Sequence, residues 1–212
     1  MPELTLYADQ TWESPWAFHA MVALEELGVP YTLDPIRRPI AKDVGDKLRD
    51  KALLGKVPCI AHGDFWLTES SAISEYLAET FAPPAHPRIL PADAQQRARA
   101  RQVMSWLRTS LMGLREDRPT SSVFMKPVTK PLSERAQRDR DELLGVSQRL
   151  LSSTRTTLFD DWCVADADLA LMLMRLVANG DPVPQRIADY TAAQWRRASI
   201  RKYLAHIPSG SR

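Results

Sequence analysis

The sequence is poor in cysteine, in long apolar runs and in net charge, and each shortage argues against a class of protein. Its 212 residues contain two cysteines, Cys59 and Cys163, which lie far apart and form no Cys-x-x-Cys pair. This argues against a disulfide scaffold and against a dithiol redox motif. No apolar run approaches the roughly 18 residues that a membrane-spanning helix needs, so we expect no membrane association.

The charges nearly cancel, because 28 Lys and Arg residues stand against 26 Asp and Glu residues, giving a net charge of +2. Nothing therefore indicates a nucleic-acid partner. The N-terminus, MPELTLYADQ, lacks a basic region followed by an apolar stretch, so we expect no secretory signal and a cytoplasmic location. The four histidines show no metal-ligand spacing such as His-x3-His, and we expect no metal.

The most informative stretch, GKVPCIAHGDFWLTESSAISEYL, begins with the pattern of a β-hairpin. Val57-Pro58 precedes a short apolar run at residues 59–61, and a second run of strand formers follows at residues 65–68. The polar, glycine-containing residues 62–64 separate the two runs, as expected for the loop of a hairpin.

A helix is predicted directly after this hairpin, opening at Glu69-Ser70 and carrying apolar residues at helical spacing. Ser70 is predicted to be its N-cap, because a serine oxygen can accept a hydrogen bond from an amide of the first turn. A helix start with unpaired N–H groups and hydroxyls is suited to bind a carboxylate.

The order Lys56-Val57-Pro58, hairpin, Glu69-Ser70 resembles the glutathione-binding half of a cytosolic glutathione transferase. The resemblance implies that the peptide bond before Pro58 is cis and that the backbone of Val57 holds the cysteinyl part of glutathione. It also implies that Glu69 and Ser70 hold the γ-glutamyl end, while Lys56 adds a cation near the bound peptide. Glutathione would be the co-substrate.

The first half of the chain gives the order β-α-β-α-β-β-α. Strands are predicted at residues 4–7 and 31–33, and a helix from Ser14-Pro15 to about Gly28, since Ser before Pro is a start signal and Gly a stop signal. A weaker helical pattern covers residues 41–54. This order is typical of a thioredoxin-like fold whose first two strands are parallel through a right-handed crossover.

A change of composition divides the chain. We expect a thioredoxin-like glutathione-binding domain at residues 1–80, a Pro-rich linker at 81–92 and an all-helical, substrate-binding domain at 93–212. A long loop with an apolar middle is predicted at 117–132. The helix patterns of the second half cover residues 93–116, 133–152, 166–178 and 186–206.

The resemblance extends into the second half. Cys163 and Asp166 occupy the ends of the family's Ser/Thr-x-x-Asp capping box, although a thiol is a poor acceptor at the cap position. Together with Trp106-Leu107-Arg108 and the segment 194–197, QWRR, the chain is most similar to the bacterial YfcF-like glutathione transferases. A transferase of this kind is expected to be a homodimer.

Glutathione chemistry needs a thiolate, and a thiol with a pKa of about 8.5 is mostly protonated at neutral pH. In the family, a Tyr, Ser or Cys near the start of the first helix activates the thiol. Ser14 is the leading candidate here, acting as a hydrogen-bond donor because no partner for a nucleophilic triad is evident. Thr11 and Tyr7 stay open as alternatives.

The helix pattern at 93–116 carries arginines at spacings of 4, 7 and 7 residues, which places four like charges on one stripe of a continuous helix. Such charges repel unless something covers them, so we expect this stripe to border a subunit interface or the substrate cleft. The arginines are Arg97, Arg101, Arg108 and Arg115. The candidates for substrate contacts are Trp16, Trp106 and Arg108.

The sequence therefore predicts an enzyme of detoxification, a glutathione transferase that directs the glutathione thiol against a small hydrophobic electrophile or a hydroperoxide. Reaction with a hydroperoxide would be glutathione peroxidase activity. Two alternatives stay open. One is a non-catalytic transferase-like module that binds a protein, and the other is a glutathione-dependent disulfide oxidoreductase.

Overall fold

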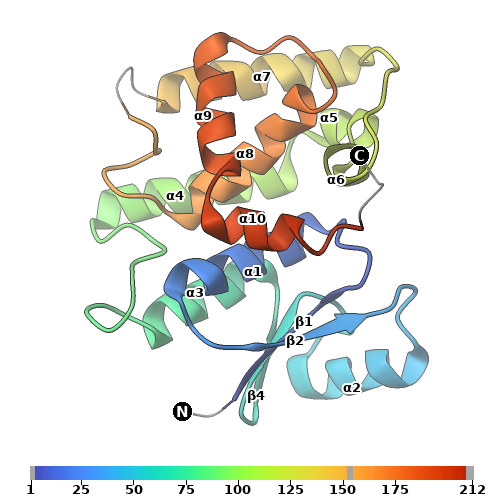
Figure 1. The fold of residues 1–212 in the computed structure, drawn as a ribbon, viewed down its shortest axis with the longest axis vertical. Coiled ribbons are helices and arrows are strands. Elements are labelled where there is room, and N and C mark those ends of the chain that lie inside the picture. Colours follow the sequence, from blue (N-terminus) through green and yellow to red (C-terminus); the bar gives the residue numbers. More distant parts are fainter. Residues whose placement is uncertain (1–2, 152–154, 209–212) are drawn as a thin grey trace. The chain divides into compact units, whose positions relative to one another are not determined.

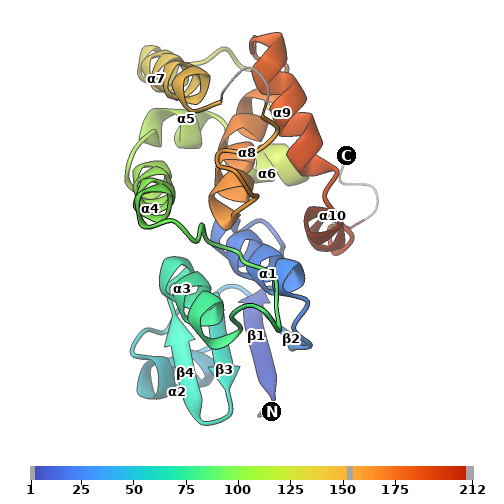
Figure 2. The same cartoon turned by 90° about the vertical axis from the view of Figure 1, so that its left-hand side faces the viewer.

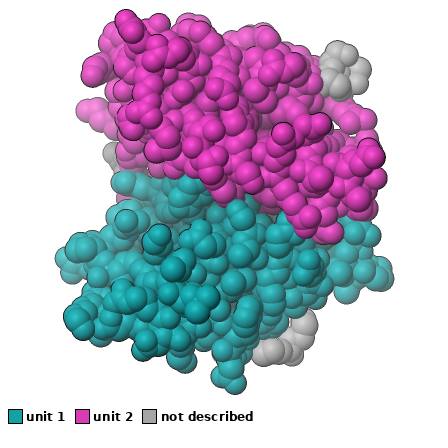
Figure 3. Space-filling view, turned by 180° about the vertical axis from the view of Figure 1, so that it is seen from behind, with its two compact units in different colours: residues 1–89 teal, residues 90–212 magenta. Residues whose placement is uncertain are grey.

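The computed structural model describes residues 3–151 and 155–208. The chain divides into two compact units, Met1–Ile89 and Leu90–Arg212, which Figure 3 draws in different colours. The division falls within residues 81–92, the stretch rich in proline. No helix among the described residues has both the length and the apolar composition that crossing a membrane requires.

The first unit is built on a four-stranded sheet with the strand order β2-β1-β3-β4. Strand β1 is parallel to β2 and antiparallel to β3, and β3 is antiparallel to β4. This mixed sheet with its helices confirms the predicted thioredoxin-like fold (Figures 1 and 2). The elements are β1 (Leu4–Asp9), α1 (Pro15–Leu27), β2 (Thr32–Ile36), α2 (Lys42–Ala52), β3 (Cys59–His62), β4 (Phe65–Thr68) and α3 (Ser70–Thr80).

The two faces of the sheet carry different helices. Helices α1 and α3 pack against each other, as Figure 2 shows, and α2 contacts β4. Leu4 and Leu6 of β1 are buried, whereas Tyr7 joins a cluster with Leu48 of α2 and Trp66 of β4. Because successive side chains of a strand point to opposite faces, the side chain of Tyr7 lies on the face covered by α2.

Helix α1 begins and ends where the sequence predicts. Ser14 is its N-cap, with its Oγ accepting hydrogen bonds from the N–H groups of Trp16 (3.3 Å) and Ala17 (3.2 Å). Pro15 is the first helical residue, where its missing N–H costs nothing. Gly28 follows the last turn with φ of 65°, a conformation that glycine adopts without strain.

The second unit is all helical over its described residues, which confirms the predicted helical domain. The helices are α4 (Ala94–Thr109), α5 (Met112–Asp117), α6 (Thr120–Phe124), α7 (Glu134–Leu150), α8 (Val164–Val177), α9 (Gln185–Trp195) and α10 (Ala198–Leu204). Residue 152, the predicted end of the helix at 133–152, lies outside the described residues.

Three sequence predictions for this unit were wrong in detail. The pattern at 93–116 is not one helix, because Ser110 is extended and Leu111 has φ of 59°, which ends α4 and starts α5 in a new direction. The predicted loop at 117–132 contains the short helix α6. The pattern at 186–206 is interrupted at Arg196-Arg197, since Arg197 is extended and acts as the N-cap of α10.

Asp166 stabilises the start of α8 as the capping-box pattern predicts. It is fully buried, and its Oδ2 accepts a hydrogen bond from the Cys163 N–H at 3.0 Å. Its Oδ1 accepts from the Leu158 N–H (2.7 Å) and the Tyr190 hydroxyl (2.9 Å), so this one carboxylate joins three separate segments. The carboxylate half of the capping box is thus present although a cysteine replaces the usual Ser or Thr.

Candidate functional site

The strand register brings three segments to the same end of the sheet. Tyr7 of β1 lies opposite Cys59 of β3, and Cys59 lies opposite Thr68 of β4. Because β3 is antiparallel to both neighbours, the segments that leave β1 and β4 emerge beside the segment that enters β3. These segments contain Ser14, Val57-Pro58 and Glu69-Ser70, which the sequence analysis named as one site.

The first of these segments, Lys56-Val57-Pro58, combines a cis peptide bond with unpaired backbone. The bond between Val57 and Pro58 is cis, as predicted. Strand pairing begins only at Cys59, and the peptide N–H and C=O of Val57 have no backbone hydrogen-bond partner among the described residues. Pro58 is buried and Lys56 is exposed. The backbone of Val57 can therefore form hydrogen bonds with the backbone of an extended peptide.

The second segment, Glu69-Ser70, begins α3 in a way that differs from the prediction. Ser70 is not the N-cap but the first helical residue, and Glu69 occupies the cap position without a side-chain capping bond. The reason is the backbone of Glu69, whose φ of 68° and ψ of 110° turn the chain one residue earlier. A glutamate rarely adopts positive φ, and such strain is concentrated at functional sites.

The two side chains of this segment lie in different environments. Ser70 is 6% exposed. Glu69 is exposed, and its carboxylate has no ion pair or hydrogen bond within the described part of the chain. An acidic side chain without a cation, beside a buried hydroxyl and the first turn of a helix, can bind a ligand that carries both an ammonium and a carboxylate group.

The third segment is the loop from β1 to α1, which ends at Ser14. The two amide hydrogen bonds described above use the oxygen lone pairs of the Ser14 hydroxyl and leave its proton to another bond. Hydrogen bonds accepted by a hydroxyl also polarise it and strengthen its own donation. The geometry thus lets Ser14 cap the helix and donate at the same time.

Asp9, which the sequence analysis did not single out, anchors this loop. It is the last residue of β1, it is 1% exposed, and its Oδ2 accepts hydrogen bonds from the Thr11 hydroxyl (2.8 Å) and the Glu13 N–H (3.2 Å). Its Oδ1 is buried without a hydrogen-bond partner among the described residues. No clear sequence signal pointed to this role, because Asp9 shares the strand register of Thr5 and Tyr7, which are only partly buried.

The other two candidates for donating a hydrogen bond to the glutathione thiolate, Thr11 and Tyr7, have different surroundings from Ser14. The Thr11 hydroxyl donates its proton to Asp9. The ring of Tyr7 stacks on Trp66, with centroids 5.0 Å apart, on the face covered by α2. Burial, followed by the charges of Asp34 and Cys59, raises the pKa of Tyr7, so its hydroxyl is a weaker acid than an exposed tyrosine.

The surroundings of both cysteines indicate a structural role. Cys59 and Cys163 are free thiols and both are fully buried. Burial raises the pKa of Cys59 to about 12, and burial together with Asp166 raises that of Cys163. A protonated, inaccessible thiol is neither a nucleophile nor a redox group. Among the described residues, no group of His, Cys, Asp and Glu side chains could hold a metal ion.

The predicted substrate contacts belong to different elements of the chain. Trp16 lies in the first turn of α1, in the first unit. Trp106 and Arg108 both belong to α4, but Trp106 donates its indole N–H to Glu142 of α7, whereas Arg108 forms an ion pair with Asp168 of α8 at 2.5 Å. Arg108 therefore has an acidic partner within its own unit, and its role at a substrate site stays a prediction.

The predicted arginine stripe is likewise divided. Arg115 belongs to α5 rather than α4, and its Nη1 donates to the carbonyl oxygen of Arg108 at 2.8 Å. The break at Leu111 removes Arg115 from the helical register of Arg97 and Arg101. The stripe therefore does not continue along one helix.

Comparison with known proteins agrees with this architecture. A family model described as "Glutathione S-transferase, C-terminal domain" matches residues 93–208, and one described as "Glutathione S-transferase, N-terminal domain" matches residues 13–80. Glutathione S-transferase T1 of Arabidopsis thaliana is 28% identical over 224 residues, which cover 98% of this chain and 87% of that protein.

Other relatives match over shorter stretches. Glutathione S-transferase U13 of Arabidopsis thaliana is 36% identical over 93 residues, 43% of this chain, and glutathione S-transferase theta-3 of Mus musculus is 36% identical over 84 residues, 40% of this chain. The matches span 39% and 34% of the lengths of these two relatives, well under two thirds.

Among solved structures, the chain is similar to a glutathione transferase homolog from Burkholderia GL BGR1 with bound glutathione. The identity is 36%, the TM-score is 0.77, and the match covers 97% of each chain. The two family models, which together cover most of the chain, agree with this likeness. The chain belongs to the glutathione S-transferase family.

Proposed function

We propose that this protein is a glutathione transferase that binds glutathione at the end of the sheet and activates its thiol with Ser14. The observation that carries the proposal is the convergence of the Ser14 loop, the unpaired backbone of Val57 and the strained Glu69-Ser70 turn at one end of the sheet. The bound glutathione in the homolog from Burkholderia supports the same ligand here.

Each part of glutathione has a complementary group in this arrangement. The backbone of Val57 would pair with the cysteinyl peptide unit, with Lys56 adding a cation near the bound peptide. The carboxylate of Glu69 would face the γ-glutamyl ammonium, while the Ser70 hydroxyl and the first turn of α3 would hold the γ-glutamyl carboxylate. Pro58 fixes the turn that presents Val57.

The thiol requires a donor that stabilises its charged form. Ser14 suits this role, since its oxygen already accepts two amide hydrogen bonds and the N-terminus of α1 adds about half a positive charge nearby. Thr11 is less suited because its proton goes to Asp9, and Tyr7 because its ring stacks on Trp66 beneath α2. A donated hydrogen bond lowers the pKa of the bound thiol toward neutral pH.

Calorimetric titration with glutathione, followed by assays against an aryl halide, a hydroperoxide and a mixed disulfide, tests the proposal. We expect binding and turnover of the electrophile, with activity on the hydroperoxide or the disulfide as further reactions of the same thiolate. Binding without any turnover would indicate a non-catalytic module. No binding of glutathione would refute the proposal.

The proposal also covers the cellular location, the oligomeric state and the subgroup of the enzyme. We infer a cytoplasmic homodimer that detoxifies small hydrophobic electrophiles, and a place among the bacterial YfcF-like transferases on account of Trp106-Leu107-Arg108 and the segment 194–197. Sedimentation analysis would test the dimer. A disulfide reductase that uses a thiol of its own is disfavoured, since Cys59 and Cys163 are both buried.

A further inference from the structure

A pocket of about 510 Å³ lies within the first unit, where β1 begins. The segment that joins α1 to β2 and the residue that follows α3 form its other sides. The glutathione site proposed above lies beyond Asp9, at the opposite end of β1. Leu4 and Asp9 are five residues apart, which corresponds to about 17 Å along a strand. The pocket is therefore separate from the glutathione site.

The inner wall of this pocket is apolar. It is formed by Leu4, Val29 and Phe81, which are all buried. The ring of Phe81 contacts two histidine rings, with centroid distances of 5.7 Å to His62 and 5.3 Å to His86. These contacts hold the phenyl ring in place. The wall can therefore receive the apolar body of a ligand but offers it no hydrogen bond.

The outer wall carries the polar groups of the pocket. The Tyr31 hydroxyl donates to Glu25 Oε1 at 2.8 Å, which ties the tyrosine ring to α1. The Thr32 hydroxyl donates to Glu3 Oε1 at 3.1 Å, so the Glu3 carboxylate is held at the rim. Glu3 has no cationic partner among the described residues, and no described residue that lines the pocket is basic.

We propose that this pocket binds small amphiphilic amines, in which a primary ammonium group is attached to an apolar body. The body would lie against Leu4, Val29 and Phe81, and the ammonium would pair with the Glu3 carboxylate. Burial of the body would supply most of the affinity, because an ion pair with an exposed carboxylate contributes little in water. Glu3 would select the charge of the head group. The volume lies within the usual range of small-molecule sites, about 300–1,000 Å³.

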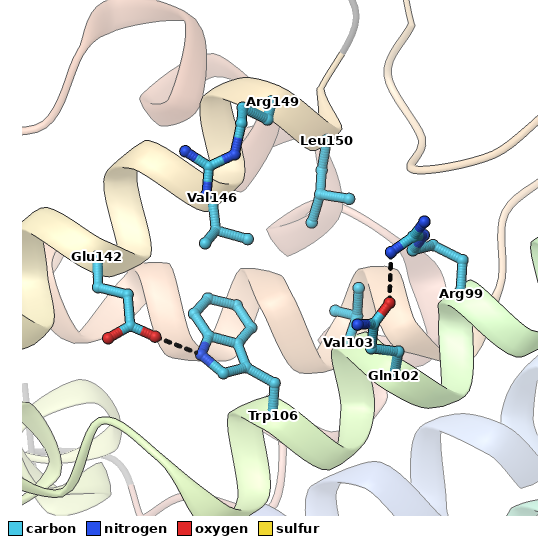
Figure 4. A pocket seen from close by; sticks show the side chains of 8 residues that line it. All are labelled: Arg99, Gln102, Val103, Trp106, Glu142, Val146, Arg149 and Leu150. Atoms are coloured by element: carbon cyan, nitrogen blue, oxygen red, sulfur yellow. Dashed lines mark hydrogen bonds between the residues drawn. The ribbon is translucent and has the colours of Figure 1, made fainter.

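The groove between α4 and α7 in the second unit is a comparison of similar size, about 580 Å³, but of different charge (Figure 4). Its one acid, Glu142, accepts the indole N–H of Trp106 at 2.7 Å. Two arginines, Arg99 and Arg149, line the same groove and would repel an ammonium group. We therefore expect the amine in the first unit and not in this groove.

Three ligands with one apolar body and different head groups test the proposal: phenylbutylamine, phenylbutanol and phenylbutyrate. In calorimetric titrations the amine should bind best, the alcohol about fivefold more weakly and the carboxylate most weakly. Glu3→Gln should weaken binding of the amine by about fivefold and leave that of the alcohol unchanged. Glu142→Gln is the matched control, which removes the acid of the other groove and should change no affinity.

A second variant locates the ligand. Thr32 is exposed on the edge strand β2, where tryptophan is a good strand former, so Thr32→Trp should fold and fill the pocket. It should weaken binding of the amine and of the alcohol by about tenfold or more. Circular dichroism would establish that both variants fold.

Salt and glutathione give two further readouts. The advantage of the amine over the alcohol should shrink in 1 M salt, where the screening length is about 3 Å. Saturating glutathione should not alter the affinity for the amine, because the two sites lie at opposite ends of β1. Competition with glutathione would overturn the proposal. So would equal affinity of the parent for the amine and the alcohol, or amine binding that is unaltered in both Glu3→Gln and Thr32→Trp.

Discussion

The Thr11 hydroxyl donates a hydrogen bond to Asp9 Oδ2 over 2.8 Å, and this bond helps to fold the loop before α1 back onto the end of β1. The Glu13 N–H donates to the same oxygen, and the Trp12 N–H donates to the Asp9 carbonyl oxygen at 3.2 Å. The loop ends at Ser14. Asp9 therefore positions the loop that carries Ser14, from a buried place at the end of β1.

Asp9→Ala should lower turnover by about tenfold or more while the KM for glutathione changes little, because a small displacement of a catalytic group has a large effect on rate. Asp9→Asn should recover most of the rate, since its amide oxygen can accept the same two hydrogen bonds. Steady-state kinetics well below the melting temperature would measure both. Loss of turnover in Asp9→Asn equal to that in Asp9→Ala would contradict a positioning role.

Ser14→Ala should raise the pKa of bound glutathione and reduce turnover at neutral pH, with recovery at higher pH as the thiol ionises without help. Affinity for glutathione should hardly change, because the proposed contacts of Val57 and Glu69 remain. The ultraviolet absorbance of the thiolate during a pH titration measures this shift.

Loss of the helix cap is a separate effect of the same change, and Ser14→Gly separates the two. Glycine caps a helix almost as well as serine, whereas alanine costs about 1 kcal/mol. Both variants should lose the same turnover but only Ser14→Ala should lose stability. If the thiol titrates in both variants as in the parent, Thr11 or Tyr7 would become the donor to test.

Most of the first unit could be predicted from sequence because local signals and the hydrophobic pattern agree there. Ser14-Pro15 and Gly28 fix the ends of α1, and the runs on either side of residues 62–64 become β3 and β4. The grouping of Ser14, Val57 and Glu69 followed from the family resemblance. The strand register explains why they meet, since it depends on pairing between strands that are far apart in sequence.

The errors arose where a single backbone conformation overrides the periodic pattern. Leu111 and Glu69 have positive φ, which no hydrophobic pattern reports, and they move the start of α5 and the N-cap of α3. The role of Asp9 was missed for a related reason. Its partners lie in the loop that follows, and only the folded loop shows that the carboxylate is buried.

Glu69→Gly should make the protein more stable and yet weaken glutathione binding. Glycine adopts positive φ freely, while an L-residue in this region costs roughly 1–2 kcal/mol, so relief of strain should raise the free energy of unfolding by about 1 kcal/mol. Loss of the carboxylate should weaken glutathione binding by about tenfold or more. Urea unfolding and calorimetry would measure the two effects.

The matched control for this change is Glu69→Ala, which removes the same carboxylate but keeps a Cβ at positive φ. It should bind glutathione as weakly as Glu69→Gly and gain no stability. Ser70→Ala should also weaken binding by about tenfold or more. Unaltered glutathione affinity in all three variants would exclude this segment from the site.

Arg108→Met should destabilise the second unit by about 3 kcal/mol, because it leaves the carboxylate of Asp168 buried without its cation. The side chains of this pair are 15% and 6% exposed. Arg135→Met is the control, since Arg135 and Glu116 form an ion pair whose side chains are 56% and 59% exposed, and it should cost less than about 1 kcal/mol. Urea denaturation measures the free energy of unfolding of both variants. Equal losses in Arg108→Met and Arg135→Met would contradict this prediction.

Cys59 should make the protein less stable as the pH rises above about 9. Burial raises the pKa of Cys59 from 9.0 to about 12, so the folded state keeps a proton that the unfolded state loses between these values. A folded state that binds more protons loses stability with rising pH in that window, by about 1 kcal/mol between pH 9 and pH 10. Other groups titrate there too, and the comparison with Cys59→Ala removes their contribution. The parent should thus lose more stability than Cys59→Ala between pH 8 and pH 10 in urea titrations, while both keep their activity at neutral pH. Equal losses would mean that the Cys59 thiol ionises as readily in the folded protein as in the unfolded chain.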